Sequence, residues 1–262
     1  MKYKFVYDQA FLDNKKFELS LEEVQLIQCI LNGGHNVCLR GYKPERIVSA
    51  IKTIVGDTQH IEEPSCDITL QDFCGGGPDL KQGVVSLAHE GLLIMNHLEN
   101  FKTSVVEMAC VPLETGSISL SRCGRTVEYP AKFQLIATIT EGCKEKIVPY
   151  SIVSKCEIDY YCKPGVERSL VKIETLVDKV VTGWQYHLSL QNSSVRNHDR
   201  EFDCGDFSEL AWDMYMSHFA SNWSKPMNLV KVARTLADMR FHTRIKTSDL
   251  ETAEKLFIPQ FV

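Results

Sequence analysis

Apolar residues recur at helical spacing near the start of the chain. They stand three or four positions apart, which predicts an amphipathic helix over Leu21, Val24, Ile27 and Leu31. Ser20-Leu-Glu-Glu23 has the pattern of a capping box, in which Ser20 caps the helix and Glu23 reaches back. Gly33-Gly34 predicts the end of this helix, because glycine readily adopts the left-handed conformation found there.

Short apolar runs then alternate with helical patterns. Buried strands are expected at 37–39 (ending at Gly41), 92–95, 133–139 and 154–161, and helices at 46–54 and 101–113. In the first of these helices the apolar side is formed by Ile47, Ala50, Ile51 and Ile54. Alternating residues around Arg122-Cys-Gly-Arg125 predict a β-hairpin. Residues 56–83 are interpreted as a loop region, with Gly75-Gly-Gly-Pro78 as a flexible turn rather than a phosphate loop. The strand–turn–helix order predicts an α/β fold with a mainly parallel sheet.

The pattern changes after Lys163-Pro-Gly165, because residues 168–257 carry almost only helical signals. We therefore expect an α/β core over 1–165 with a β-hairpin insert, and a helical lid domain over 166–262. One lid helix follows the apolar positions from Leu229 to Met239, and Ser248 with Glu251 predicts a capping box at the last helix. The tryptophans are expected in the lid core or at an interface: Trp184, Trp212 and Trp223.

Composition narrows the classes of function. The 262 residues carry a net charge of −5, which gives no general attraction to nucleic acid. No apolar run reaches the roughly 18 residues that a membrane span needs, and no signal-peptide layout is present. A cytoplasmic location without membrane association is expected. The ten cysteines include no CxxC pair, so reduced structural thiols are expected instead of a metal site.

Several motifs, in one order over 33–238, resemble the magnesium-chelatase-like AAA+ proteins, in particular the competence-associated ComM/YifB type. The matching stretches are Gly33-Gly-His-Asn36 with the following strand and Gly41, 83–91, 101–107, Pro112-Leu-Glu114 with Gly116, Ser121-Arg122, 129–135 and 231–238. The resemblance implies a P-loop NTPase-like three-layer core with a C-terminal helical lid. It also implies an ATP site built from a Walker A loop, a Walker B strand and two sensor positions.

The residues at those positions depart from what ATP hydrolysis needs. The loop is Gly41-Tyr42-Lys43-Pro44-Glu45-Arg46-Ile47-Val48; aligned with the family, Ile47 and Val48 replace its lysine and threonine, and Pro44 and Arg46 replace glycines. Asn96 and His97 replace the Walker B Asp-Glu, and Thr140 replaces the sensor-1 asparagine. Arg234 stands at the sensor-2 position, as a vestigial phosphate contact or as a structural ion pair. We interpret these residues as a vestigial nucleotide site with no catalytic residue.

No cofactor is expected, and ATP with magnesium would bind only weakly. His89-Glu90 and His97 with Glu99 lack HExxH spacing, so no metal site is predicted. Arg122 has the same two interpretations as Arg234. The sequence around Lys155 departs from the family pattern, which weakens an interface role. The family's cysteine-containing insertion is missing, and Cys143 alone stands in its place. The leading hypothesis is a pseudo-ATPase that binds or regulates an unidentified protein partner, as a monomer or weak oligomer. The alternatives are a DNA-processing module, which the charge disfavours, and residual nucleotide binding through Lys43, Arg46 and Arg234.

Overall fold

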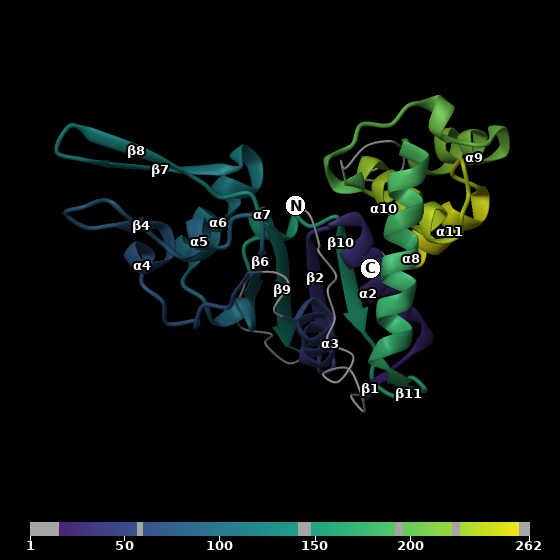
Figure 1. Cartoon of the computed structure of the whole chain (residues 1–262), viewed down its shortest axis with the longest axis horizontal. Helices are drawn as coiled ribbons and strands as arrows, with labels where there is room; N and C mark the ends of the chain where they lie inside the picture. Colours follow the sequence, from purple (N-terminus) through teal and green to yellow (C-terminus); the bar gives the residue numbers. More distant parts are fainter. Residues whose placement is uncertain (1–15, 57–59, 141–147, 192–195, 222–225, 257–262) are drawn as a thin grey trace.

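A five-stranded parallel β-sheet forms the centre of the molecule (Figure 1). The computed structural model describes residues 16–56, 60–140, 148–191, 196–221 and 226–256. The strand order is β10-β2-β9-β6-β3. These strands are β2 (Val37–Gly41), β3 (Ile61–Glu62), β6 (Leu92–Met95), β9 (Gln134–Thr140) and β10 (Ile158–Cys162). The fold is α/β and P-loop NTPase-like, as the sequence predicted.

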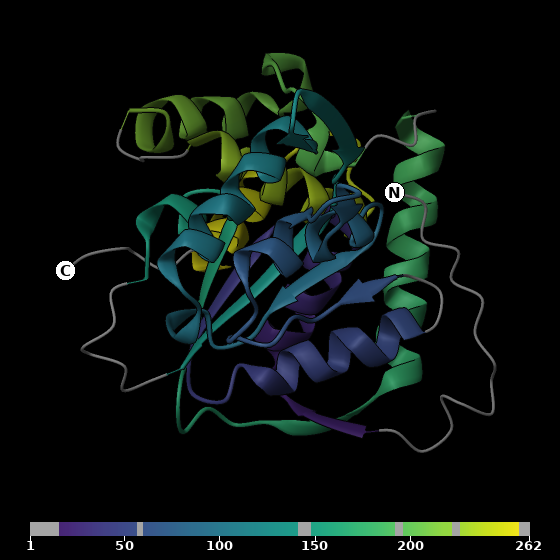
Figure 2. The same ribbon diagram turned by 90° about the vertical axis from the view of Figure 1, so that its left-hand side faces the viewer.

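Helices cover both faces of the sheet, because neighbouring residues of a strand point to opposite sides. Leu39 faces a hydrophobic cluster with α2 (Leu21–Gly33), α3 (Glu45–Val55) and the C-terminal helices. Cys38 faces a second cluster with α5 (Val84–Leu87), α6 (Thr103–Thr115) and α7 (Tyr150–Val153). The turned view shows the sheet between these layers (Figure 2).

The start of α2 has the predicted capping box. The Glu23 amide donates to Ser20 Oγ at 3.2 Å, and the Ser20 amide donates to Glu23 Oε2 at 2.9 Å. At the other end, Gly34 has a φ of 69° and donates its amide to the Ile30 carbonyl oxygen. This left-handed cap stops the helix and turns the chain into β2.

Two hairpins project from the α6 side of the sheet (Figure 1). The predicted one consists of β7 (Ser117–Arg122) and β8 (Arg125–Pro130), joined at Cys123 and Gly124. The interpretation of 56–83 as a loop region was wrong in part. This region contains β3, α4 (Leu70–Cys74) and a short hairpin of β4 (Gly75–Gly76) with β5 (Lys81–Gln82). These elements are too short to produce a periodic pattern.

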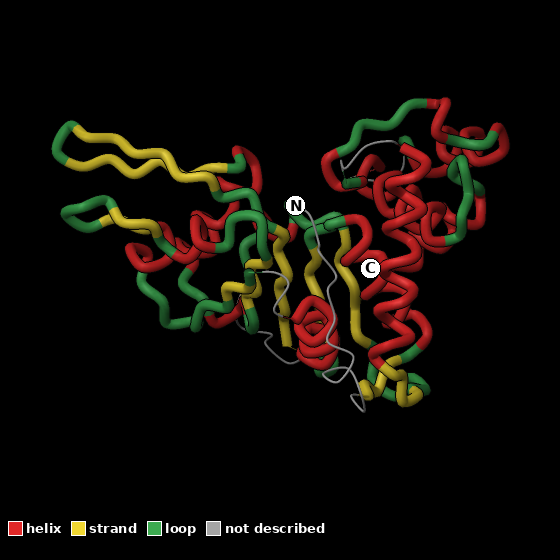
Figure 3. Tube along the Cα trace, viewed as in Figure 1, coloured by secondary structure: helices red, strands yellow, loops and turns green. Residues whose placement is uncertain are grey.

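The C-terminal part is mainly helical (Figure 3). It contains α8 (Ile173–Gln191), the short turns η3 (Asn197–Asp199) and η4 (Cys204–Asp206), α9 (Glu209–Met214), the π-helical turn η5 (Tyr215–Phe219), α10 (Pro226–Met239) and α11 (Thr247–Leu256).

Two expectations for this part were wrong. Residues 169–172 form a strand, β11 (Ser169–Lys172), which pairs antiparallel with β1 (Lys16–Leu19). The last helix begins before Ser248, and the carboxylate of Asp249 accepts the Lys246 amide at 2.9 Å. Because α8 and α10 share the Leu39 cluster with the sheet, the domain division at 165 stays a prediction.

Other expectations can be compared only in part. Trp212 packs edge-on against Phe207 in the C-terminal part, whereas the Trp184 side chain, Trp223 and Cys143 lie outside the described residues. Cys29 and Cys38 are buried free thiols, and burial raises the pKa of Cys38 to about 12. Among the described helices, none has both the length and the apolar character that a bilayer crossing requires.

Candidate functional site

The candidate site lies at the carboxyl edge of the sheet, where β2, β6 and β9 end. Gly41 at the end of β2 lies between its register partners Thr140 on β9 and Cys162 on β10. Asn96 and His97 follow β6 directly. Parallel strands direct their carboxyl ends to one edge, where α/β proteins commonly bind ligands. The topology thus brings together the Gly41–Val48 segment, Asn96, His97 and Thr140.

The connection from β2 to α3 is short, and most of its amides are used internally. Helix α3 begins at Glu45, with Pro44 as its N-cap and no side-chain cap. The Tyr42 amide donates to the Cys162 carbonyl oxygen at 2.8 Å, and the Ile47 amide donates to that of Pro44 at 3.0 Å. Pro44 has no amide hydrogen to donate. This leaves few N–H groups of the loop to face an anion.

The loop carbonyls instead face a cation from the same loop. Arg46 Nη1 donates to the carbonyl oxygens of Tyr42 at 2.9 Å and Lys43 at 3.2 Å. Its Nη2 forms an ion pair with Glu23 of α2, whose other partner is Arg168, with 3.3 Å between Arg168 Nε and Glu23 Oε2. Burial has the largest effect on Glu23 and raises its pKa, but hydrogen bonds from Arg46, the Ser20 amide and Arg168 outweigh it and lower the pKa. The loop is therefore closed around a guanidinium.

Two residues of the predicted site point into the core. Ile47 is 0% exposed and Val48 is 2% exposed, and both belong to the cluster that contains Leu39. Lys43 and Tyr42 are exposed, with the Lys43 ammonium 5.2 Å from the centroid of the Tyr42 ring. In the described part of this loop, Arg46 is held in an ion pair with Glu23, whereas the Lys43 side chain is exposed and lies beside the Tyr42 ring. Ile47 and Val48 therefore do not line a ligand surface.

The residues after β6 form a polar group with the ends of β9 and the start of α3. His97, with a φ of 55°, places its Nδ1 2.7 Å from Thr140 Oγ1 and its Nε2 3.7 Å from Glu45 Oε1. Glu99 Oε1 lies 3.7 Å from His97 Nδ1 and accepts the Thr140 amide at 3.3 Å. Imidazole and carboxylates dominate this group.

Asn96 belongs to the same edge. Its Nδ2 donates to Glu63 at 2.5 Å, and its Oδ1 accepts the Thr138 hydroxyl at 3.3 Å. Both hydrogen-bonding ends of the Asn96 amide thus have partners inside the protein. No group of three or more His, Cys, Asp or Glu residues suited to a metal ion occurs in the described part of the chain.

Arg234 lies apart from this group, inside α10. Its side chain is 1% exposed, and its Nη2 forms an ion pair with Asp238 at 2.6 Å. Nη1 and Nη2 also donate to the carbonyl oxygens of Thr243 at 3.2 Å and His242 at 2.6 Å. Of the two interpretations made from the sequence, these contacts favour the structural ion pair.

Sequence reasoning missed several partners of the site. The sequence predicted Glu23 only as the second residue of a capping box. Nothing in the pattern indicated that Glu23 Oε1 would pair with Arg46. Arg168 reaches Glu23 across the sequence, where no periodic signal applies. Glu99 was considered with His97 only as a possible metal ligand, and its hydrogen bond from the Thr140 amide was not predicted.

Comparisons with known proteins agree with these motifs. A family model described as "Magnesium chelatase, subunit ChlI" matches residues 46–160. The chain is 38% identical over 76 residues to YifB of Salmonella typhimurium, 36% over 76 residues to the competence protein ComM of Haemophilus influenzae, and 33% over 99 residues to a Mycobacterium tuberculosis protein.

The matched stretches are short relative to both partners. They cover 29% of this chain and 15% of the YifB and ComM chains, and 34% of this chain and 20% of the M. tuberculosis protein. The chain therefore matches only a small part of each relative, and the match to the family model runs from α3 to β10.

Proposed function

Because the chain belongs to the magnesium-chelatase-like family, related to ComM and YifB, we propose that it is a pseudo-ATPase. It uses the family fold to bind or regulate a protein partner and does not hydrolyse ATP. The single observation that carries this proposal is the loop after β2, which presents carbonyl oxygens to its own Arg46.

A phosphate-binding loop needs the opposite polarity. Its backbone N–H groups surround the phosphate oxygens, and a lysine and a hydroxyl reach the phosphates and magnesium. Here the Arg46 guanidinium is not available to bind a phosphate, because it is bonded to the carbonyl oxygens of Tyr42 and Lys43 and to the Glu23 carboxylate. The residues at the family positions for lysine and threonine are buried apolar side chains. A triphosphate would find neither the amides nor the hydroxyl that it requires.

The charge at this edge argues in the same direction. Glu45, Glu63 and Glu99 lie around Asn96 and His97, so the local carboxylates would repel a triphosphate. The carboxylate that the family places after its Walker B strand to hold magnesium is here an amide, Asn96. The residues therefore do not fit a magnesium–triphosphate complex, and we assign no catalytic step to them.

Thermal unfolding with and without nucleotide tests the proposal. A ligand that binds only the native state raises Tm. Because we propose that the site does not bind nucleotide, we expect the same Tm in buffer, magnesium-ATP and magnesium-ADP. Phosphate release should stay at background in a coupled assay. Magnesium-dependent turnover that disappears in the variants Lys43→Met and Asn96→Ala would refute the proposal, since a contaminating ATPase would be unaffected by either change.

Residual nucleotide binding is the weaker form of the same idea. Three cations were candidates, but Arg46 and Arg234 are paired with Glu23 and Asp238, which leaves Lys43 exposed. Isothermal titration with ATP, with and without magnesium, measures this binding directly. Binding that is lost in Lys43→Met would support a residual site.

DNA processing remains a second candidate because of the projecting β7–β8 hairpin. Arg122 and Arg125 are exposed register partners on either side of its turn, so they place two positive charges at the tip. Electrophoretic mobility shifts at low salt, with single- and double-stranded DNA, test this function. A salt-sensitive shift that is lost in Arg122→Ser/Arg125→Ser would favour it over the pseudo-ATPase with a protein partner.

The oligomeric state follows from the same reasoning. In ring-forming relatives nucleotide helps to join neighbouring subunits, and a site that does not hold nucleotide lacks that link. We propose a monomer or weak oligomer, which multi-angle light scattering without nucleotide can measure. A stable hexamer would contradict this part of the proposal.

A further inference from the structure

Four consecutive residues at the amino edge of the sheet each contact a different element. We call residues 196–199 the clasp. Arg196 Nη1 donates to the Leu31 carbonyl oxygen at the end of α2, at 2.9 Å. His198 Nδ1 lies 3.0 Å from Glu157 Oε1, just before β10. Asp199 Oδ2 lies 3.1 Å from Lys132 Nζ, just before β9.

The remaining clasp residue, Asn197, is 2% exposed and reaches α10. Its Nδ2 donates to Thr235 Oγ1 at 3.1 Å and to Asp238 Oδ2 at 2.9 Å. The same Asp238 oxygen lies 2.8 Å from His187 Nδ1 of α8. The clasp therefore connects both long C-terminal helices with α2 and two strands of the sheet.

Thr235 lies at the centre of this network and is 1% exposed. A hydroxyl has one hydrogen to donate and two lone pairs to accept. Thr235 Oγ1 donates to the Lys231 carbonyl oxygen at 3.1 Å, accepts from Asn197 and lies 2.8 Å from His35 Nε2. Its full capacity is used, so replacing the hydroxyl by a methyl group would leave two buried polar side chains without this partner.

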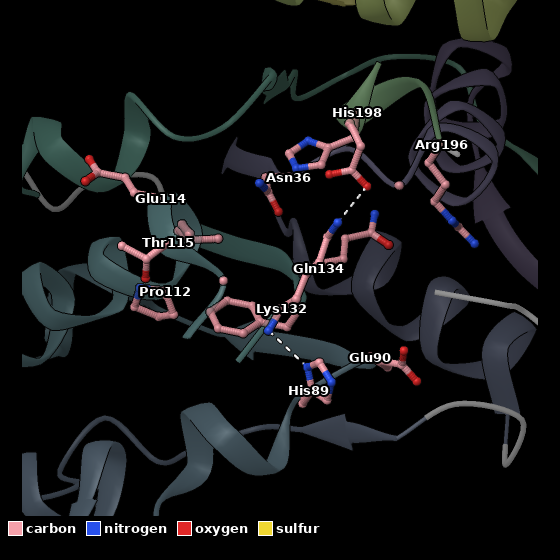
Figure 4. A pocket seen from close by; sticks show the side chains of 15 residues that line it. Asn36, His89, Glu90, Pro112, Glu114, Thr115, Lys132, Gln134, Arg196 and His198 are labelled. Atoms are coloured by element: carbon pink, nitrogen blue, oxygen red, sulfur yellow. Dashed lines mark hydrogen bonds and ion pairs between the residues drawn. The ribbon is translucent and has the colours of Figure 1, made fainter. Parts of the chain in front are cut away.

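The clasp also forms one wall of a cavity of about 280 Å³ at this edge, opposite the candidate nucleotide site (Figure 4). The close view shows His198, Asn36 and Lys132 gathered around it. The facing wall is the end of α6, residues 112–116.

We propose that the clasp is a conformational device that holds α8 and α10 to the amino edge of the sheet, and that breaking it releases these helices while the sheet stays folded. Hydrophobic packing between the helices and the sheet is not directional, whereas the clasp fixes their position through bonds to named groups. The inference concerns the opposite edge from the nucleotide site and does not depend on the pseudo-ATPase proposal.

Native-state hydrogen exchange of the full chain, followed peptide by peptide, tests the clasp. In Thr235→Val we expect amides of α8, α10 and the clasp to exchange at least about tenfold faster than in the wild type, because two buried hydrogen bonds lose a partner. Amides of β2 and β9 should change by less than about twofold, since the sheet keeps its own ladder.

Thr182→Val is the matched control, because exposed Thr182 on α8 makes the same type of bond to the carbonyl oxygen four residues earlier, at 2.7 Å from Asp178. It should change neither set of amides. If Thr235→Val does not fold, His198→Gln at the partly exposed end of the clasp should give the same pattern at smaller size. Equal acceleration in helices and strands, or none in the helices, would overturn the inference.

Discussion

Arg46 donates a hydrogen bond at 2.9 Å to the carbonyl oxygen of Tyr42, four residues before it in the same loop. This contact reverses the polarity expected of a phosphate loop, in which backbone donors face an anion. The cation is internal and its main counter-charge is Glu23, whose side chain is 2% exposed. The ion pair between Arg46 and Glu23 of α2 therefore stabilises the loop without a charged ligand.

Arg46→Met should lower the free energy of unfolding by about 2 kcal/mol, because it removes one partner from a buried carboxylate while Arg168 remains. Urea denaturation at neutral pH measures this change. Lys52→Met is the control, since Lys52 and Glu63 form an exposed pair with side-chain exposures of 41% and 35%. A control loss as large as the Arg46→Met loss would show that charge removal in general, and not the buried pair, is responsible.

The same variant should change the acid dependence of stability. The pKa of Glu23 is lowered in the folded state, so its contribution is present above the unfolded pKa and is lost as pH falls through the folded pKa. Urea titrations of the wild type between pH 7 and about pH 3 should show this loss. Arg46→Met should show a shallower fall, and parallel curves would contradict the assigned role of Arg46.

Ile47→Lys places a lysine where the family has one, and we expect it to fail as a repair. Ile47 is 0% exposed, so an unpaired ammonium there should destabilise the protein by roughly 3 kcal/mol or more. Ser49→Lys, on the exposed side of the same helix, should change stability little. A stable Ile47→Lys variant whose Tm rises with magnesium-ATP would mean that the loop can reopen around a phosphate.

Ile47 also shows what could be predicted from the sequence. The helical spacing of Ile47, Ala50, Ile51 and Ile54 predicted a buried face, and all four are 0% exposed. Alignment with the family placed the same residue at a ligand-binding position. The local pattern determined its orientation, because burying an isoleucine is favourable wherever the chain continues as a helix.

Local patterns likewise predicted the capping box at Ser20 and the hairpin turn at Cys123-Gly124. Contacts between distant segments could not be predicted in this way. The pairing of β1 with β11 and the ion pair of Glu23 with Arg168 join residues about 150 positions apart, and neither strand nor side chain signals its partner in the sequence. The candidate site depends on such contacts. The sequence therefore identified its residues but did not predict how their side chains are oriented.

Arg234→Met distinguishes a structural arginine from a phosphate-sensing one. It leaves Asp238 buried without its i−4 cation, so the free energy of unfolding should fall by about 3–5 kcal/mol. Arg244→Met, an exposed arginine five residues beyond α10, should have little effect. Circular dichroism during thermal unfolding measures both. A stable Arg234→Met protein that has lost measurable ATP binding would favour the sensor interpretation instead.

His198 should make stability depend on pH in the neutral range. Burial has the largest effect and lowers its pKa, but the Glu157 carboxylate, with Asp199, outweighs this effect and raises it, against an opposing contribution from Lys231. A raised folded pKa means that the contribution is fully present below the unfolded pKa and is lost as pH rises through the folded pKa. The difference in unfolding free energy between the wild type and His198→Gln should therefore be largest at about pH 6 and should narrow toward about pH 9.

His60→Gln, at a side chain that is 57% exposed, is the control and should leave the wild-type pH profile unchanged. A difference that widens with pH would show that the neutral imidazole is the stabilising form and that the ion pair with Glu157 does not hold the clasp.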